Sequence, residues 1–186
     1  MIAAIEGRSE IIKLLVSHST NNQHTDDMGF NALTLAVTAH HIHDDTITLL
    51  LQHSNTADIN SALYVSAEAG HVSVVSTLLS EGADVNTKQT SYGLTPLIIA
   101  ARHGHTEVAR TLLAHQAHID TQDTLLGMTA LMEAAMGGNK DLVLLLLEHQ
   151  PNTSLQDKHG QTALRRAQMN NHTTIVKILK QHTNTV

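Results

Sequence analysis

The chain of 186 residues contains no cysteine, and this absence excludes several kinds of chemistry. Disulfide bonds, thiolate metal sites and cysteine nucleophiles all require a side chain that is missing here. Tryptophan is also missing, and the other aromatic residues are limited to one Phe and two Tyr. The hydrophobic core must therefore be built from aliphatic side chains, for which the hydrophobic content of 41% is sufficient.

Proline and long apolar runs are scarce as well. Only two prolines occur, which favours a mostly helical chain because proline interrupts helices. The longest apolar run covers residues 142–147, whereas a membrane-spanning helix needs about 20 apolar residues. The N-terminal residues 1–8 contain too few consecutive apolar side chains for a signal peptide. We therefore expect a cytoplasmic protein without a membrane segment.

Motifs typical of enzymes are missing too. The sequence has no G-x-S-x-G, no Walker loop and no H-E-x-x-H. The net charge of −6 argues against nucleic acid as a partner, because phosphate binding needs a concentrated basic face. We predict a protein that is not an enzyme and has no cofactor.

What the sequence does contain is an internal repeat. A leucine opens each unit, and successive copies are 30, 34, 34 and 33 residues apart: Leu33, Leu63, Leu97, Leu131 and Leu164. A pair of leucines near the end of each unit follows the same period: Leu50–Leu51, Leu78–Leu79, Leu112–Leu113 and Leu146–Leu147. Two independent landmarks with one period indicate tandem structural units, each too small to bury its apolar face alone.

The unit at residues 93–113 shows most clearly how each copy is built. Thr95 is a good helix N-cap, and Pro96 is well tolerated at the first helical position. Gly104 can adopt the left-handed conformation that ends a helix. A second helix is expected after it, with Glu107 in its first turn, where a negative charge is favourable.

At these residues the sequence resembles the ankyrin repeat family. The segment GLTPLIIAARHGHTEVARTLLAHQAHID, residues 93–120, is similar to the family consensus. The resemblance implies an all-α repeat solenoid of about six helix-turn-helix units, with β-hairpin fingers and a concave groove. We predict a single domain over residues 1–186, with a partial unit at about 1–27 and further units at 28–60, 61–92, 93–126, 127–159 and 160–186.

Some positions depart from the family pattern. Only eight residues separate His53 from Ala62, so the finger there should be stunted. Gln116 and Gln150 replace the glycine that usually ends the second helix. The last unit carries polar residues, among them Arg165 and Arg166, that are expected to form a solvent-facing cap. The first unit lacks its opening turn, which favours a fragment of a longer protein over simple fraying.

A cluster of histidines and aspartates interrupts the second unit. Imidazole and carboxylate groups can bind zinc or nickel, so His40, His41, His43 and Asp44 are a weak candidate for a metal site. Against this interpretation, the cluster has no ligand set of recognisable spacing. A solvated loop between helices is the favoured reading.

Histidines also recur directly after the leucine pair in each unit: His18, His53, His115, His149 and His182. They could act as a pH sensor that strengthens contact with an acidic partner below about pH 6.5. The favoured alternative is that imidazole simply suits the negative end of the helix dipole.

The resemblance implies a module that binds a protein partner through its finger tips and the exposed ends of its first helices. Transferred onto this sequence, the partner-binding candidates are Glu68, Tyr92, Arg102, His103, Leu125, Leu126, Met136 and Met169. The protein is expected to be a monomer that binds neither nucleic acid nor membranes. Two alternatives remain open: a substrate-recruiting segment of a larger enzyme or effector protein, and a self-assembling structural protein.

Overall fold

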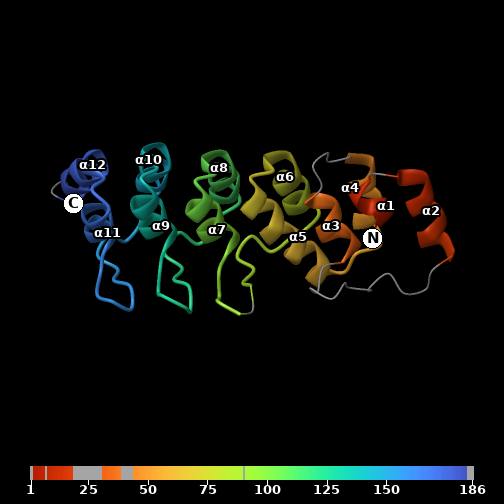
Figure 1. The fold of residues 1–186 in the computed structure, drawn as a ribbon, viewed down its shortest axis with the longest axis horizontal. Helices are drawn as coiled ribbons and strands as arrows, with labels where there is room; N and C mark the ends of the chain where they lie inside the picture. The colour runs from red at the N-terminus through yellow and green to blue at the C-terminus, as the bar shows by residue number, and fades with distance from the viewer. Residues whose placement is uncertain (1, 7, 19–30, 39–43, 90, 184–186) are drawn as a thin grey trace. The chain divides into compact units, whose positions relative to one another are not determined.

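The computed structural model describes residues 2–6, 8–18, 31–38, 44–89 and 91–183. Its contacts divide the chain into two compact parts, Met1–Asp84 and Val85–Val186. They are called unit 1 and unit 2 from here on, and the single copies of the sequence pattern are called repeats. Over the described residues each unit contains six helices and no strand (Figure 1). The all-α repeat fold expected from the sequence is confirmed.

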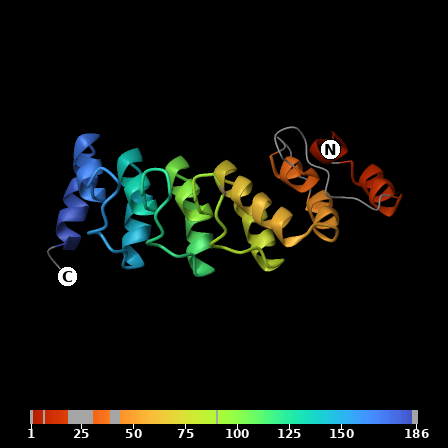
Figure 2. The same ribbon diagram turned by 90° about the horizontal axis from the view of Figure 1, so that it is seen from below.

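Unit 2 is built from three consecutive helix pairs. The first helices of the pairs are α7 (Pro96–His103), α9 (Ala130–Gly137) and α11 (Ala163–Met169). The second helices are α8 (Thr106–Ala114), α10 (Lys140–Glu148) and α12 (Thr173–Thr183). Because α9 packs against both α7 and α11, and α10 against both α8 and α12, the helices form two layers (Figure 2).

The first helices begin at threonine caps, as the sequence predicts for Thr95. The hydroxyl oxygen of Thr95 accepts a hydrogen bond from the Ile98 N–H at 3.3 Å. Thr129 and Thr162 do the same for α9 and α11, at 3.2 and 3.3 Å. The helix α7 ends at Gly104, whose φ of 76° is left-handed as expected.

Small and aliphatic side chains fill the space between the layers of unit 2. Alanines in the first helices, such as Ala100, Ala134 and Ala167, are fully buried and let neighbouring helices approach closely. Leucines of the second helices, such as Leu112 and Leu146, are also fully buried. Each buried leucine contributes about 1.5–3 kcal/mol relative to an exposed one, so this packing holds the short helices in place.

The second helices of unit 2 end in a way that the sequence only partly indicates. Gln116 and Gln150 adopt left-handed φ angles of 64° and 53°, although neither is a glycine. The backbone geometry of the family is therefore kept here without its usual residue. This conformation costs roughly 1 kcal/mol for a residue with a side chain.

Unit 1 also consists of paired helices. Its first helices are α1 (Ile2–Ile5), α3 (Ala32–Val37) and α5 (Thr56–Ala69). They pair with α2 (Ser9–His18), α4 (Asp44–Leu51) and α6 (Val72–Ser80). Asn31 caps α3 by accepting a hydrogen bond from the Thr34 N–H at 2.8 Å, and its amide also donates to Asp58 at 2.6 Å.

The helix α5 is longer than the repeat pattern suggests, with 14 residues. It begins directly after Asn55, which forms a reciprocal capping box with Asp58. The residues that would form a finger between α4 and α5 are therefore helical. Residue 61, where a new repeat was expected to open, lies inside α5. The short spacing after His53 is the cause, because it leaves too few residues for an extended loop.

Candidate functional site

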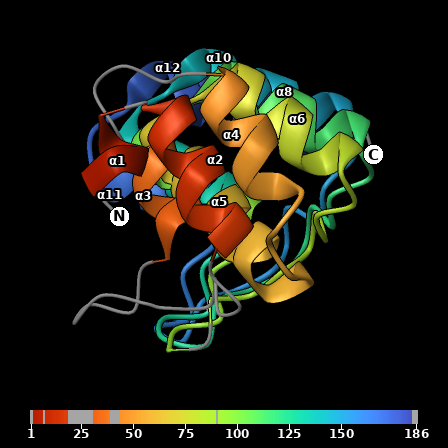
Figure 3. The same ribbon diagram turned by 90° about the vertical axis from the view of Figure 1, so that its right-hand side faces the viewer.

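Unit 2 presents three loops that precede its first helices, at residues 87–89 and 91–95, 121–129 and 155–162. The loops extend to one side of the unit, away from α8, α10 and α12 (Figure 3). They are joined by backbone hydrogen bonds, from the Thr124 N–H to the Tyr92 carbonyl oxygen at 2.8 Å and from the Lys158 N–H to the Leu126 carbonyl oxygen at 2.9 Å. The three loops therefore form one connected surface.

Side chains strengthen the connection between the loops. The Gln122 side-chain amide donates to the carbonyl oxygens of Gly127, at 2.6 Å, and of Gln156 in the next loop, at 2.8 Å. The Lys158 ammonium group donates to the Thr124 carbonyl oxygen at 2.5 Å. Gly93 permits the close approach of the first two loops, because a Cβ atom at this residue would lie 2.7 Å from the Thr124 methyl group. A partner would thus meet a surface that is already ordered.

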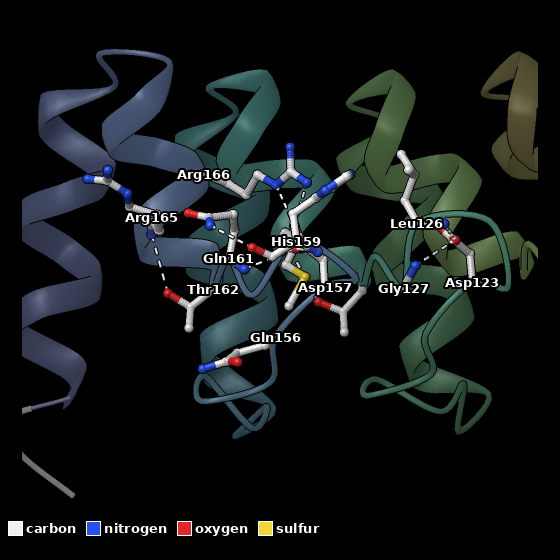
Figure 4. Close-up of polar contacts among 12 residues, drawn as sticks. Asp123, Leu126, Gly127, Gln156, Asp157, His159, Gln161, Thr162, Arg165 and Arg166 are labelled. Atoms are coloured by element: carbon white, nitrogen blue, oxygen red, sulfur yellow. Dashed lines mark hydrogen bonds and ion pairs between the residues drawn. The ribbon is translucent and has the colours of Figure 1, made fainter.

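Each of the last two loops folds around a buried aspartate. Asp123 accepts hydrogen bonds from the N–H groups of Leu126 and Gly127, at 2.6 and 3.1 Å. Asp157 accepts equivalent bonds from His159 and Gln161, at 2.8 and 3.0 Å (Figure 4). These internal bonds fix the loop backbone and determine which side chains remain at the tip.

Large apolar side chains remain exposed on the first two loops. Tyr92 is 46% exposed, Leu125 51% and Leu126 37%. Met169, at the end of α11, is 57% exposed. Because aromatic and flexible apolar side chains dominate the energy of protein interfaces, the tips have the composition of a docking surface.

Arg102, one of the expected surface residues, is occupied inside unit 2. Its guanidinium group donates two hydrogen bonds to Glu133 of α9, at 2.7 and 3.0 Å, and lies 4.0 Å from the Asp123 carboxylate. Both acidic side chains are buried, and one oxygen of each accepts no hydrogen bond from any described residue. Arg102 therefore ties α7 to α9 and balances charge that water does not reach.

Arg166 shows a related arrangement in α11. It binds Asp157 through both a hydrogen bond from Nε, at 2.6 Å, and an ion pair. Only 15% of the Arg166 side chain is exposed, so the expectation that it belongs to the solvent-facing cap is wrong. Arg165 is exposed as expected and points away from Asp157 (Figure 4).

These contacts determine the protonation of Asp157. Burial by itself would raise the pKa of this carboxyl group. The hydrogen bonds from the Gln161 N–H, from Arg166 and from the His159 N–H outweigh burial, and the pKa of Asp157 is lowered from its ordinary value. Asp157 is therefore an ionised structural group.

The expected partner-binding residues lie in both units. Tyr92, Leu125 and Leu126 come together on the joined loops, with Arg102 and the exposed His103 at the end of α7. The His103 ring stacks on His105 with centroids 6.0 Å apart. Two candidates on first helices differ in exposure, since Met136 is half-buried and Met169 is exposed. Glu68 is exposed on α5 of unit 1.

Most of the candidate metal site lies outside the part of the chain that the structure describes. His40, His41 and His43 lie outside the described residues, and Asp44 is the first residue of α4. Elsewhere in the described ranges, no group of three His, Asp or Glu side chains is placed to hold a metal ion.

The histidines at the ends of the second helices have a structural role. The Nδ1 atoms of His53, His115 and His149 lie 3.1, 2.9 and 3.1 Å from the carbonyl oxygens four residues earlier. Each ring nitrogen is thereby within hydrogen-bonding distance of a carbonyl oxygen in the last turn of its helix. The helix-end interpretation accounts for these three histidines.

Comparison with known families agrees with the geometry. The sequence profile described as ankyrin repeats (3 copies) matches residues 1–62, 43–123 and 117–186. No curated protein matches the chain at a significant level. None of the helices in the described ranges is long and apolar enough to cross a membrane.

Proposed function

Because this chain belongs to the ankyrin repeat family, whose repeats are generally protein-interaction modules, we propose that it is a non-catalytic module that binds a protein partner on unit 2. The binding surface consists of the three joined loops and the exposed ends of α7, α9 and α11. The observation that carries the proposal is the exposure of Tyr92, Leu125 and Leu126 on loops that are held by hydrogen bonds to one another.

The finer architecture belongs to the same proposal. The six helix pairs α1/α2 to α11/α12 correspond to six repeats within one domain, and the three loops of unit 2 act as fingers. The protein works as a cytoplasmic monomer and does not bind nucleic acid, in keeping with its net charge of −6. Use as a substrate-recruiting segment of a larger enzyme would involve this same surface.

Site-specific photo-crosslinking tests the proposed surface. The photoreactive residue p-benzoyl-phenylalanine is placed at Leu125 and, as a matched control, at Leu144, which is exposed on α10 of the other layer. We expect a partner protein to crosslink from position 125, and the product to disappear when Tyr92→Ala is added. Equal products from both positions, or none from position 125 in the cells that produce the protein, would contradict the proposal.

A further inference from the structure

The two layers of unit 2 carry different charge. The first layer, taken as α7, α9, α11 and the loops before and after them (residues 85–89, 91–105, 121–139 and 155–172), has five Lys and Arg and three Asp and Glu, a net charge of +2. The second layer, taken as residues 106–120, 140–154 and 173–183, has four of each and is neutral. The net positive charge of unit 2 therefore lies in the layer that carries the loops.

Burial of the acidic residues of the first layer increases the difference in surface charge between the two layers. The three acidic residues of the first layer, Asp123, Glu133 and Asp157, are 4%, 2% and 6% exposed and face Arg102 or Arg166. Over the described residues, the first layer thus shows the solvent no exposed carboxylate. Its exposed cations are Lys88, Arg102, Lys158 and Arg165, of which Arg102 is paired with Glu133. In the second layer the four acidic residues are all exposed: Glu107, Asp120, Asp141 and Glu148.

Exposed apolar side chains follow the same division. Among the described residues of unit 2, five large apolar side chains are exposed, and four of them belong to the first layer: Tyr92, Leu125, Leu126 and Met169. Only Leu144 belongs to the second. A surface that combines cations, apolar side chains and no exposed acid is complementary to an acidic segment with apolar side chains.

We infer that the partner of unit 2 presents an acidic protein segment that carries large apolar side chains. This inference rests on the proposed function and gives it a chemical class. Carboxylates of the segment face Lys88 and Lys158, while its apolar side chains pack on Tyr92, Leu125 and Leu126. Nucleic acid fits less well, because four exposed cations interspersed with leucines do not form a continuous row for phosphates.

The test uses defined probes and the full chain. Binding of fluorescent copolymers of glutamate and tyrosine, glutamate and alanine, and lysine and tyrosine is measured by fluorescence anisotropy at low salt. We expect the glutamate–tyrosine copolymer to bind at least about ten-fold more tightly than the other two, and to weaken as salt is added. The lysine copolymer tests the charge, and the alanine copolymer tests the apolar contribution.

Two charge-reversed variants locate the site. We expect the double variant Lys88→Glu with Lys158→Glu to bind the glutamate–tyrosine copolymer about ten-fold more weakly than the unmodified protein does. The control, Lys140→Glu with Lys177→Glu, changes the net charge equally in the second layer and should leave affinity within about two-fold. Should the first variant fold poorly by circular dichroism, Lys88→Gln with Lys158→Gln replaces it.

Several results would overturn the inference. These are equal binding of the lysine copolymer, equal weakening by both variants, tighter binding of a single-stranded DNA of matched length, or no binding of any copolymer. Salt-sensitive self-association in sedimentation velocity would also overturn it, because the acidic occupant would then be another copy of the chain. Photo-crosslinking at position 125 tests the proposed function independently of this inference. A partner that is not acidic would still crosslink there.

Discussion

The Asp157 carboxylate is buried in its loop, yet it stays ionised because Gln161, His159 and Arg166 donate hydrogen bonds to it. Its pKa is lower in the folded protein than in the unfolded chain, where it is about 3.9. The stabilisation is therefore complete above the unfolded value and is lost as the pH falls from about 3.9 toward the folded pKa. Protonation of Asp157 at acidic pH should therefore loosen this loop.

The variant Asp157→Asn checks this assignment. The amide cannot match the charge of Arg166, so we expect the free energy of unfolding at neutral pH to fall by about 1–3 kcal/mol. The remaining stability should vary less with pH below about 4, since one titrating group is gone. Urea unfolding from pH 3 to 7 measures both effects, and an unchanged slope below pH 4 would show that Asp157 is not the titrating group.

Single residues also show what the sequence could and could not predict. The caps at Thr95 and Gly104 were predictable, because their roles depend on neighbours within one helix. The role of Arg102 was not, because its partner Glu133 is 31 residues away. The sequence nonetheless contained a signal. Glu133 lies two residues after Leu131, and the corresponding residue after Leu97 is the apolar Ile99. An acidic residue at a repeat position that is otherwise buried and apolar requires a cation nearby.

Between elements, Arg102 connects α7 to α9 through two hydrogen bonds to Glu133. Replacing it by alanine leaves Glu133 and Asp123 buried without a cation, so we expect unfolding to become easier by about 2–3 kcal/mol. Arg110→Ala is the control, because its pair with Glu107 on α8 is more than half exposed on both sides. That variant should change stability by less than about 1 kcal/mol.

Chemical denaturation of Arg102→Ala and Arg110→Ala measures the free energy of unfolding of each variant and so tests this prediction. Equal stability of Arg102→Ala and the unmodified protein would mean that Arg102 is available to a partner, as the sequence first suggested. The result also affects binding studies, because a destabilising change at Arg102 could be mistaken for loss of a contact. Tyr92 and Leu125, whose side chains project from the loops, are cleaner positions for such studies.

The helix α5 shows the limit of the repeat pattern at the level of elements. The short spacing after His53 correctly predicted that a full finger could not form there. It did not predict that α5 would extend back to Thr56, since that depends on whether the remaining residues can start a helix. Asn55 and Asp58 supply the capping box that makes this possible, and their spacing was visible in the sequence.

For the molecule as a whole, the repeat period predicted the fold class, but it indicated neither the division into two units nor their difference in charge. Residues 1–84 contain two Lys and Arg and ten Asp and Glu, a net charge of −8, whereas residues 85–186 carry +2. The total of −6 hides this contrast. For unit 2, the scattered placement of the exposed cations, rather than the net charge, argues against nucleic acid.

The division into units leads to a prediction about where binding resides. Unit 2 contains three complete helix pairs with their own buried core and joined loops, and about three repeats are needed for an array to be stable. We expect a fragment of residues 85–186 to be helical, to unfold cooperatively, and to bind the glutamate–tyrosine copolymer as tightly as the full chain. Circular dichroism and anisotropy measure these properties, with residues 1–84 as the control that should not bind. A folded fragment that fails to bind would place part of the binding surface in unit 1, with Glu68 as the first position to examine.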